Sequence, residues 1–304
     1  YLNQNTGVLS RMMQKRGNKT RHYDFFEHQT TKGVTWAKSM FVSSDNQPIY
    51  QTDERELQLN LNDGKSVQIP QGYKQQLPRK MVDESKLTIR ELAEDVYFVG
   101  QGWGYTLFID LGDYYISAGS WGYQNNTDSW KKALDLLRKT TGSDKPVSQH
   151  LVSHHHTDHM SALNSIVGEG ASLILHPSDI PAVNKHLAQP LDNSRFIPIS
   201  ETTKLAGGKV MLFDVPNSHA SHNMVMYLSG SKILFTEDMF GSSFEVGHHS
   251  PANWPHLDTY QRLDKLMEKL KELGLEVEQY VSSHHVKVLS QSDIGAALKL
   301  IFKE

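Results

Sequence analysis

The chain has 304 residues, of which 38% are hydrophobic and 21% charged, with a formal net charge of −3 and a mean hydropathy of −0.50. This length can bury a substantial core, no apolar run is long enough to span a bilayer, and no Lys/Arg block offers the clustered cations that a phosphate backbone requires. Cysteine is absent, so disulfides, thiolate nucleophiles and thiolate metal ligands are excluded, and any metal must be bound by His, Asp or Glu. We expect a globular protein with a small-molecule substrate, no nucleic-acid partner and no membrane insertion, and we leave a homodimer open.

Residues 1–86 are rich in Gln, Asn, Lys and Arg and have few sustained apolar patterns, which predicts an accessory region. Within it, residues 57–70 alternate apolar and polar positions around Asn62-Asp63-Gly64, a pattern that predicts a β-hairpin. The chain begins at Tyr1 without a charged and apolar leader, so we expect it to be a processed or trimmed form of a longer precursor. Its location stays open, with the periplasm or the exterior slightly preferred over the cytoplasm.

From residue 87 onward, short β runs alternate with amphipathic segments. Residues 128–142 place Trp130, Ala133, Leu134 and Leu137 on one helical face. Residues 259–274 predict a second helix with Asp258 as its N-cap and Gly274 as its end. Further strands are predicted around residues 149–153, 171–176, 223–228 and 232–238, with a tight turn at 229–231, and a helix closes the chain. We therefore expect residues 87–304 to form an α/β domain, in which helices flank two mixed sheets.

The segment Ser153–His159 reads SHHHTDH and directly follows a predicted strand. His154 and His156 are two positions apart, so an extended backbone directs both imidazoles to one side and His155 to the other. Thr157 is predicted to cap a helix that begins near Asp158, which would direct Asp158 and His159 into the same cavity. This is more donors than one tetrahedral zinc ion takes from a single loop, which favours two adjacent metals with further ligands from elsewhere.

These residues resemble the His-x-His-x-Asp-His signature of the metallo-β-lactamase superfamily, whose fold is an αββα sandwich. The sequence that precedes the motif, residues 92–116, is similar to the bacterial glyoxalase II and lactonase-like branch of that superfamily. The resemblance implies three further ligands, which His219, Asp238 and His284 supply in the expected order. It implies a first metal held by His154, His156 and His219, a second held by Asp158, His159 and His284, and Asp238 as the bridge. Two zinc ions per chain are expected, with iron or manganese as alternatives. The neighbouring His222 and His285 are alternative ligands.

Three positions depart from the usual pattern of the family. Ser117 stands where many members carry an aspartate, and Ser218 and Ser283 stand where glycine commonly flanks the third and fifth histidines. These positions support loops, so we expect ligation to survive and the shape of the pocket to differ.

The chemistry that follows is hydrolysis by a metal-bridging hydroxide, directed at an ester, lactone, thioester or β-lactam. Asp158 is the predicted catalytic residue, which orients the hydroxide or passes a proton to the leaving group. The segment between Asp238 and His284 is polar and aromatic and should overhang the metals. The candidate pocket residues are His222, His248, His249, Trp254 and His285.

Two alternatives use the same fold. One is a mononuclear iron oxidoreductase similar to the persulfide dioxygenases; a flavodiiron version usually has glutamate at the position of His156. The other is a phosphodiesterase, which we consider weaker because the short stretch between Asp238 and His284 leaves no room for an inserted nuclease domain. His150 and His176 lie outside every motif, and surface or capping roles suffice for them.

Overall fold

The computed structural model describes residues 1–16, 19–59, 86–102, 104–120, 129–240, 257–284 and 286–301. Internal contacts divide the chain into two compact units, Tyr1–Arg79 and Lys80–Glu304. The domain boundary that we expect between residues 86 and 87 stays a prediction. The hairpin predicted at 57–70 lies almost entirely outside the described residues.

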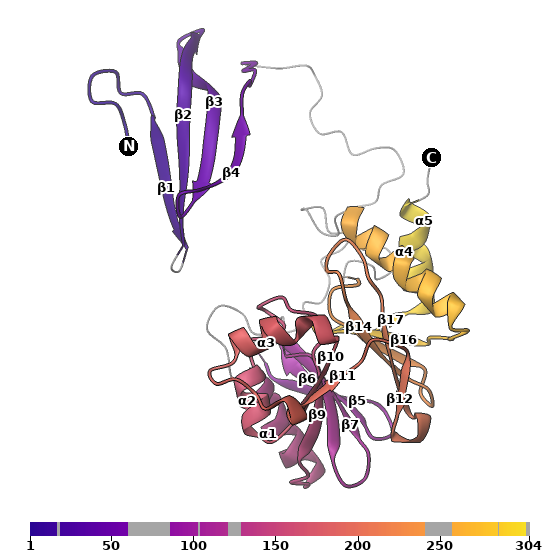
Figure 1. The fold of residues 1–304 in the computed structure, drawn as a ribbon. Coiled ribbons are helices and arrows are strands. Elements are labelled where there is room, and N and C mark those ends of the chain that lie inside the picture. Colours follow the sequence, from indigo (N-terminus) through magenta and orange to yellow (C-terminus); the bar gives the residue numbers. More distant parts are fainter. Residues whose placement is uncertain are drawn as a thin grey trace. The chain divides into compact units, whose positions relative to one another are not determined.

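The N-terminal unit contains a four-stranded antiparallel sheet in the order β1-β2-β3-β4 (Figure 1). Two of its turns contain residues with positive φ, Lys32 and Gly33 in one and Asp45 and Asn46 in the other, as tight hairpins require. No described residue of β2 is fully buried, so the alternation that usually reveals a strand is weak there. The strands are β1 (Arg11–Arg16), β2 (Lys19–Thr31), β3 (Val34–Ser44) and β4 (Gln47–Thr52).

The C-terminal unit begins with a mixed seven-stranded sheet in the order β11-β10-β9-β8-β7-β6-β5. Strands β5 to β8 pair antiparallel, whereas β8, β9, β10 and β11 pair parallel. The bounds are β5 (Thr88–Ala93), β6 (Val96–Gln101), β7 (Gly104–Asp110), β8 (Tyr115–Ala118), β9 (Val147–Leu151), β10 (Ser172–Leu175) and β11 (Phe196–Pro198).

A second, six-stranded sheet has the order β12-β13-β14-β15-β16-β17. It is also mixed, because β15 and β16 run parallel while the other neighbours run antiparallel. The predicted tight turn at residues 229–231 joins β14 to β15. The bounds are β12 (Thr203–Leu205), β13 (Val210–Asp214), β14 (Met224–Leu228), β15 (Ile233–Thr236), β16 (Gln279–Ser282) and β17 (Leu289–Ser290).

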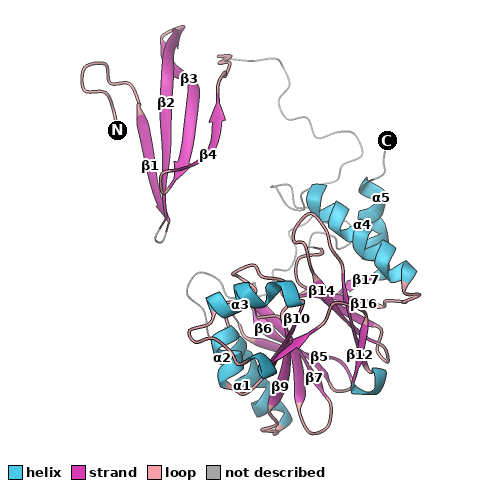
Figure 2. Cartoon of the chain, in the orientation of Figure 1, coloured by secondary structure: helices cyan, strands magenta, loops and turns pink. Residues whose placement is uncertain are grey.

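Three apolar clusters organise these sheets into four layers (Figure 2). The first joins helices α1 to α3 to the seven-stranded sheet, the second lies between the two sheets, and the third joins α4 and α5 to the six-stranded sheet. The α/β sandwich that we predicted, with two mixed sheets flanked by helices, is therefore confirmed. The helices are α1 (Ser129–Thr141), α2 (Leu163–Gly168), α3 (Ile180–His186), α4 (Leu257–Glu272) and α5 (Gln291–Ile301), with 3-10 turns η1 (Pro177–Asp179), η2 (Asn193–Arg195) and η3 (Ala206–Gly208).

Helix α1 confirms its predicted face, because Trp130, Ala133, Leu134 and Leu137 are its buried residues. Helix α4 is also confirmed, and Gly274 ends it with a φ of +64°. Its predicted N-cap is wrong, since the helix already includes Leu257 and Asp258. Among the described residues, no helix combines the length and apolar character needed to cross a lipid bilayer.

The helix predicted to begin near Asp158 is wrong. Residues 157–162 form turns, and α2 begins only at Leu163. Hydroxyl groups occupy the carbonyls that a helix would use: Ser120 donates to the carbonyl of His159, and Ser161 donates to that of Asp158. Thr157 is consequently not a helix cap.

Candidate metal centre

The predicted ligands all lie in loops at strand ends of the C-terminal unit. His154 to His159 follow β9, and His219 lies in the loop between β13 and β14. Asp238 and His284 each come two residues after the neighbouring parallel strands β15 and β16, whose register pairs Thr236 with Ser282. The topology therefore gathers segments that are up to 130 residues apart in the sequence, as the difference between positions 154 and 284 shows.

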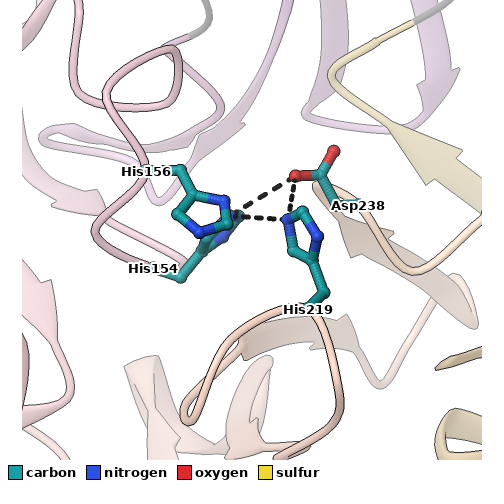
Figure 3. A group of neighbouring side chains, drawn as sticks. All are labelled: His154, His156, His219 and Asp238. Carbon is teal, nitrogen blue, oxygen red and sulfur yellow. Dashed lines mark hydrogen bonds and ion pairs between the residues drawn. The ribbon is translucent and has the colours of Figure 1, made fainter. Parts of the chain in front are cut away.

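The first group of ligand-type side chains consists of His154, His156, His219 and Asp238, with one donor atom of each within 4.8 Å of the others. Nε2 of His154 lies 3.1 Å from Nδ1 of His156 and 3.3 Å from Nε2 of His219. Oδ2 of Asp238 lies 2.7 Å from Nε2 of His219 and 3.4 Å from Nε2 of His154 (Figure 3). Two ligands of one tetrahedral zinc ion, with bonds of about 2.0–2.1 Å, lie about 3.3 Å apart. The separations of 3.1, 3.3 and 3.4 Å fit such an ion, whereas the 2.7 Å between Asp238 and His219 is a hydrogen-bond distance.

The second group consists of Asp158, His159 and His284, again with donor atoms within 4.8 Å of one another. Nε2 of His159 lies 3.6 Å from Oδ2 of Asp158, and the rings of His159 and His284 meet edge to face with centroids 5.0 Å apart. All seven residues that we predicted as ligands thus fall into these two groups, divided as the resemblance implied.

Asp238 connects the two groups. Its Oδ2 lies 2.8 Å from Nε2 of His159 as well as against His219, and its Oδ1 contacts Nε2 of His284. Its side chain is only 8% exposed, so this carboxylate is buried among imidazoles. Burial alone would raise its pKa, but the charges and hydrogen bonds of His159, His154 and His219 hold the pKa of Asp238 well below its ordinary value.

The histidines respond to burial in two ways. Burial lowers the pKa of His154 to about 4, and burial followed by repulsion from His219 lowers the pKa of His156. Both imidazoles are therefore neutral at pH 7, the form that binds a cation. Burial acts in the same direction on His159, but the carboxylates of Glu237 and Asp238 outweigh it and raise the pKa of His159 well above its ordinary value.

Several supporting residues were missed by the sequence analysis. The Ser153 hydroxyl lies 2.8 Å from Nδ1 of His154, and the Asn217 side chain accepts the backbone N–H of His219 at 2.8 Å. The buried guanidinium of Arg262, on α4, donates to the carbonyl of Asp238. Glu237 is 3% exposed and contacts His159. The one signal in the sequence was a carboxylate directly beside Asp238, at the end of an apolar strand.

His222 lies outside both groups, and its role as an alternative ligand stays a prediction. Its Nδ1 lies 2.7 Å from Oδ2 of Asp214, and its ring stacks on His176 with centroids 3.3 Å apart and planes 9° from parallel. His176, Asp214 and His222 have donor atoms within 4.8 Å of one another. A single ion cannot lie near both ring planes when the rings stack this closely, so we do not interpret this trio as a metal site. The role of His222 in a pocket stays a prediction.

The remaining candidates divide between two outcomes. His248, His249, Trp254 and His285 lie outside the described residues. His176 accepts the N–H of Ser178 at the start of η1, which confirms a capping role. The prediction of a surface or capping role for His150 is wrong, because the residue is fully buried in β9 and its Nδ1 lies 2.8 Å from the Ser117 hydroxyl.

Comparison with solved structures identifies the fold. FIM-1 metallo-β-lactamase from Pseudomonas aeruginosa, solved in a mono-zinc form, aligns with a TM-score of 0.54 at 15% identity, over 71% of this chain and 94% of that one. The metallo-β-lactamase from Pontibacter korlensis aligns with a TM-score of 0.53 at 15% identity, over 72% of this chain and 100% of that one. The C-terminal unit therefore has the metallo-β-lactamase fold, as the signature predicted. The lactonase-like branch stays a prediction.

Sequence comparison finds a shorter match. Anaerobic nitric oxide reductase flavorubredoxin from Salmonella arizonae is 26% identical over 97 residues, and its homologue from Escherichia coli O157:H7 is 26% identical over the same length. The match covers 31% of this chain and spans 20% and 24% of those relatives. No protein-family model matches the chain.

Proposed function

We propose that this chain is a metal-dependent hydrolase that binds two metal ions, with zinc as the leading choice. The observation that carries the proposal is the buried carboxylate of Asp238, which contacts imidazoles from both groups of ligand-type residues. A carboxylate at this position would connect two cation sites rather than serve one. The first ion would be held by His154, His156 and His219, and the second by Asp158, His159 and His284.

The donor set fits these ions. It consists of nitrogen and carboxylate oxygen without sulfur, which suits zinc and also accepts iron or manganese. The spacing of the first group matches a tetrahedral shell, and burial keeps His154 and His156 unprotonated at neutral pH. Burying a carboxylate among imidazoles that are largely neutral is costly, and bound cations would compensate its charge.

When bound, the two ions would lower the pKa of a water molecule toward neutrality and polarise a substrate carbonyl. The chain's own contribution is positional. Asp158 is the more accessible carboxylate, with 46% of its side chain exposed, and it stays ionised because His159 and His284 lower its pKa against the effect of burial. An ionised carboxylate at the open edge can orient a water molecule, accept its proton and return the proton to a leaving group.

The proposed substrate class is an ester, lactone, thioester or β-lactam. Its support is the fold, which this chain has in common with proteins named metallo-β-lactamases, together with a donor set that needs no protein nucleophile. Each member of this class has an electrophilic carbonyl and a leaving oxygen, sulfur or nitrogen.

A second candidate function is iron-dependent oxidoreduction, and the match to relatives named nitric oxide reductase flavorubredoxin favours it. Identity of 26% over 97 residues concerns part of the chain only. The ligand residues separate the two functions only in part: His156 stands where a flavodiiron version usually has glutamate, but imidazole and carboxylate ligands accept iron as well as zinc. The identity of the bound metal would separate the two functions.

The test is elemental mass spectrometry of protein purified without chelator, followed by assays with lactone, thioester, ester and β-lactam substrates. We expect about two zinc ions per chain and hydrolysis of at least one class, with both lost in Asp238→Ala and both kept in the control Asp179→Asn. One iron per chain without hydrolysis would transfer support to the oxidoreductase. No bound metal after reconstitution would refute both functions.

A further inference from the structure

Glu237 is a buried carboxylate with no place in the ligand signature. It lies at the end of β15, directly before Asp238, with 2% of its side chain exposed. Oε2 of Glu237 lies 2.6 Å from Nδ1 of His159, a contact with the distance of a hydrogen bond but without its direction. Nε2 of His159, on the other side of the ring, faces Asp238 at 2.8 Å. The imidazole is therefore held between two carboxylates, one beside each ring nitrogen.

The same glutamate also reaches the strand end that carries His284. Its Oε2 accepts the hydroxyl of Ser283, and its backbone carbonyl accepts the hydroxyl of Ser282 at 2.7 Å. Ser282 in turn accepts the backbone N–H of His284 at 3.2 Å. Glu237 thus contacts His159 through its carboxylate and reaches the segment of His284 in two ways, through its carboxylate at Ser283 and through its backbone carbonyl at Ser282.

The first group has neutral support instead. Nδ1 of His154 lies against the Ser153 hydroxyl, and the loop of His219 is held by the amide oxygen of Asn217. A charged partner behind a ligand imidazole fixes its orientation and raises its basicity, which strengthens its bond to a metal. A hydroxyl or amide gives orientation with much less charge.

We propose that Glu237 is a positioning residue for the second metal, and that it makes the centre bind two ions where it would otherwise bind one at limiting metal concentration. This inference rests on the proposed function. It explains why a carboxylate is buried where its partners are one imidazole ring and serine hydroxyls, since a cation on the far side of that ring would compensate its charge. It also gives a role to Ser283, which stands where the family that the signature resembles commonly has glycine.

The test is zinc titration of metal-stripped protein against a chromophoric chelator, which resolves the two binding steps. The variant is Glu237→Gln, which keeps size and removes charge. We expect the second dissociation constant to rise about 10–100-fold while the first changes little. Asp179→Asn is the matched control: Asp179 is a buried carboxylate 2.8 Å from Nδ1 of His155, yet His155 belongs to neither group. It should bind both ions as the unmodified protein does.

Ser283→Ala provides a second variant, because it removes the hydroxyl that fixes the Glu237 carboxylate and leaves its charge in place. We expect a smaller rise in the second constant only. Titration with Co²⁺ gives an independent signal, since loss of the second site alone removes one component of the visible absorption. An unchanged second dissociation constant in both variants would overturn the inference. The proposed function would still stand in that case if the unmodified protein binds two zinc ions. Absence of zinc from the unmodified protein would overturn both.

Discussion

Nδ1 of His155 lies 2.8 Å from Oδ1 of Asp179, so the middle histidine of three consecutive histidines is paired away from both groups of ligand-type residues. Its neighbours His154 and His156 have nitrogens 3.1 Å apart in the first group. This division follows from the alternation of side chains along an extended backbone. It makes neighbouring residues of one type respond differently to the same substitution.

His154→Ala and His156→Ala should each lose the first metal and nearly all hydrolytic activity, whereas His155→Ala should keep both. Removal of an outer partner already costs about 10–100-fold in metal affinity or activity, so loss of a direct ligand should exceed about 100-fold. Metal content and substrate turnover measured on the three variants check this. Equal losses in all three would show that the loop is needed as a whole and that the individual ligands are misassigned.

Metal removal should also lower thermal stability. An ion that binds the folded chain at about 100 times its dissociation constant adds about 2.7 kcal/mol to the free energy of unfolding. For a unit of this size we expect chelation to lower the unfolding temperature by at least about 5 °C. Scanning calorimetry with and without chelator measures the shift, and Asp238→Ala should show much less of it. A full shift in that variant would mean that the stabilising ion binds elsewhere.

The sequence predicted the features that depend on periodicity and spacing. The apolar face of α1 and the order of the ligand residues could be read directly, because each is set by local spacing. The turns at 157–162 could not be predicted in this way. They depend on the hydroxyl of Ser120, which is distant from the motif in sequence, and on that of Ser161, which lies just after it. The contact of Glu237 could not be predicted because its partner His159 is 78 positions away, the difference between the two residue numbers. The N-terminal sheet was not predicted, because β2 buries no residue fully and its sequence therefore lacks the alternation of apolar and polar positions.

Gly119 should tolerate no side chain. Its φ is +89°, and a Cβ there would lie 2.5 Å from the carbonyl oxygen of Tyr105 and 2.9 Å from Cζ of Phe235. Gly119→Ala should therefore combine backbone strain with overpacking, and the overpacking alone costs about 1–3 kcal/mol. Gly112 is the matched control, because its φ is +96° and its Cβ would meet nothing within 4 Å. Gly112→Ala should show the strain alone in denaturant unfolding, and equal losses in the two variants would argue against the close packing.

His150 should make the folded unit sensitive to acid. It is fully buried, and burial lowers its pKa to about 3 from an ordinary value of 6.5. Above pH 6.5 both folded and unfolded chains hold it neutral, but below that value only the unfolded chain takes up the proton, so stability falls as the pH drops toward 3. Between pH 7.5 and pH 5 this residue should lower the free energy of unfolding by about 2 kcal/mol.

The measurement is guanidinium unfolding of metal-stripped protein and of His150→Gln at both pH values. The variant starts less stable, since it disturbs the contacts with Ser117 and Trp130, but it should lose about 2 kcal/mol less on acidification. Equal pH dependence in the two proteins would show that His150 accepts a proton in the folded state.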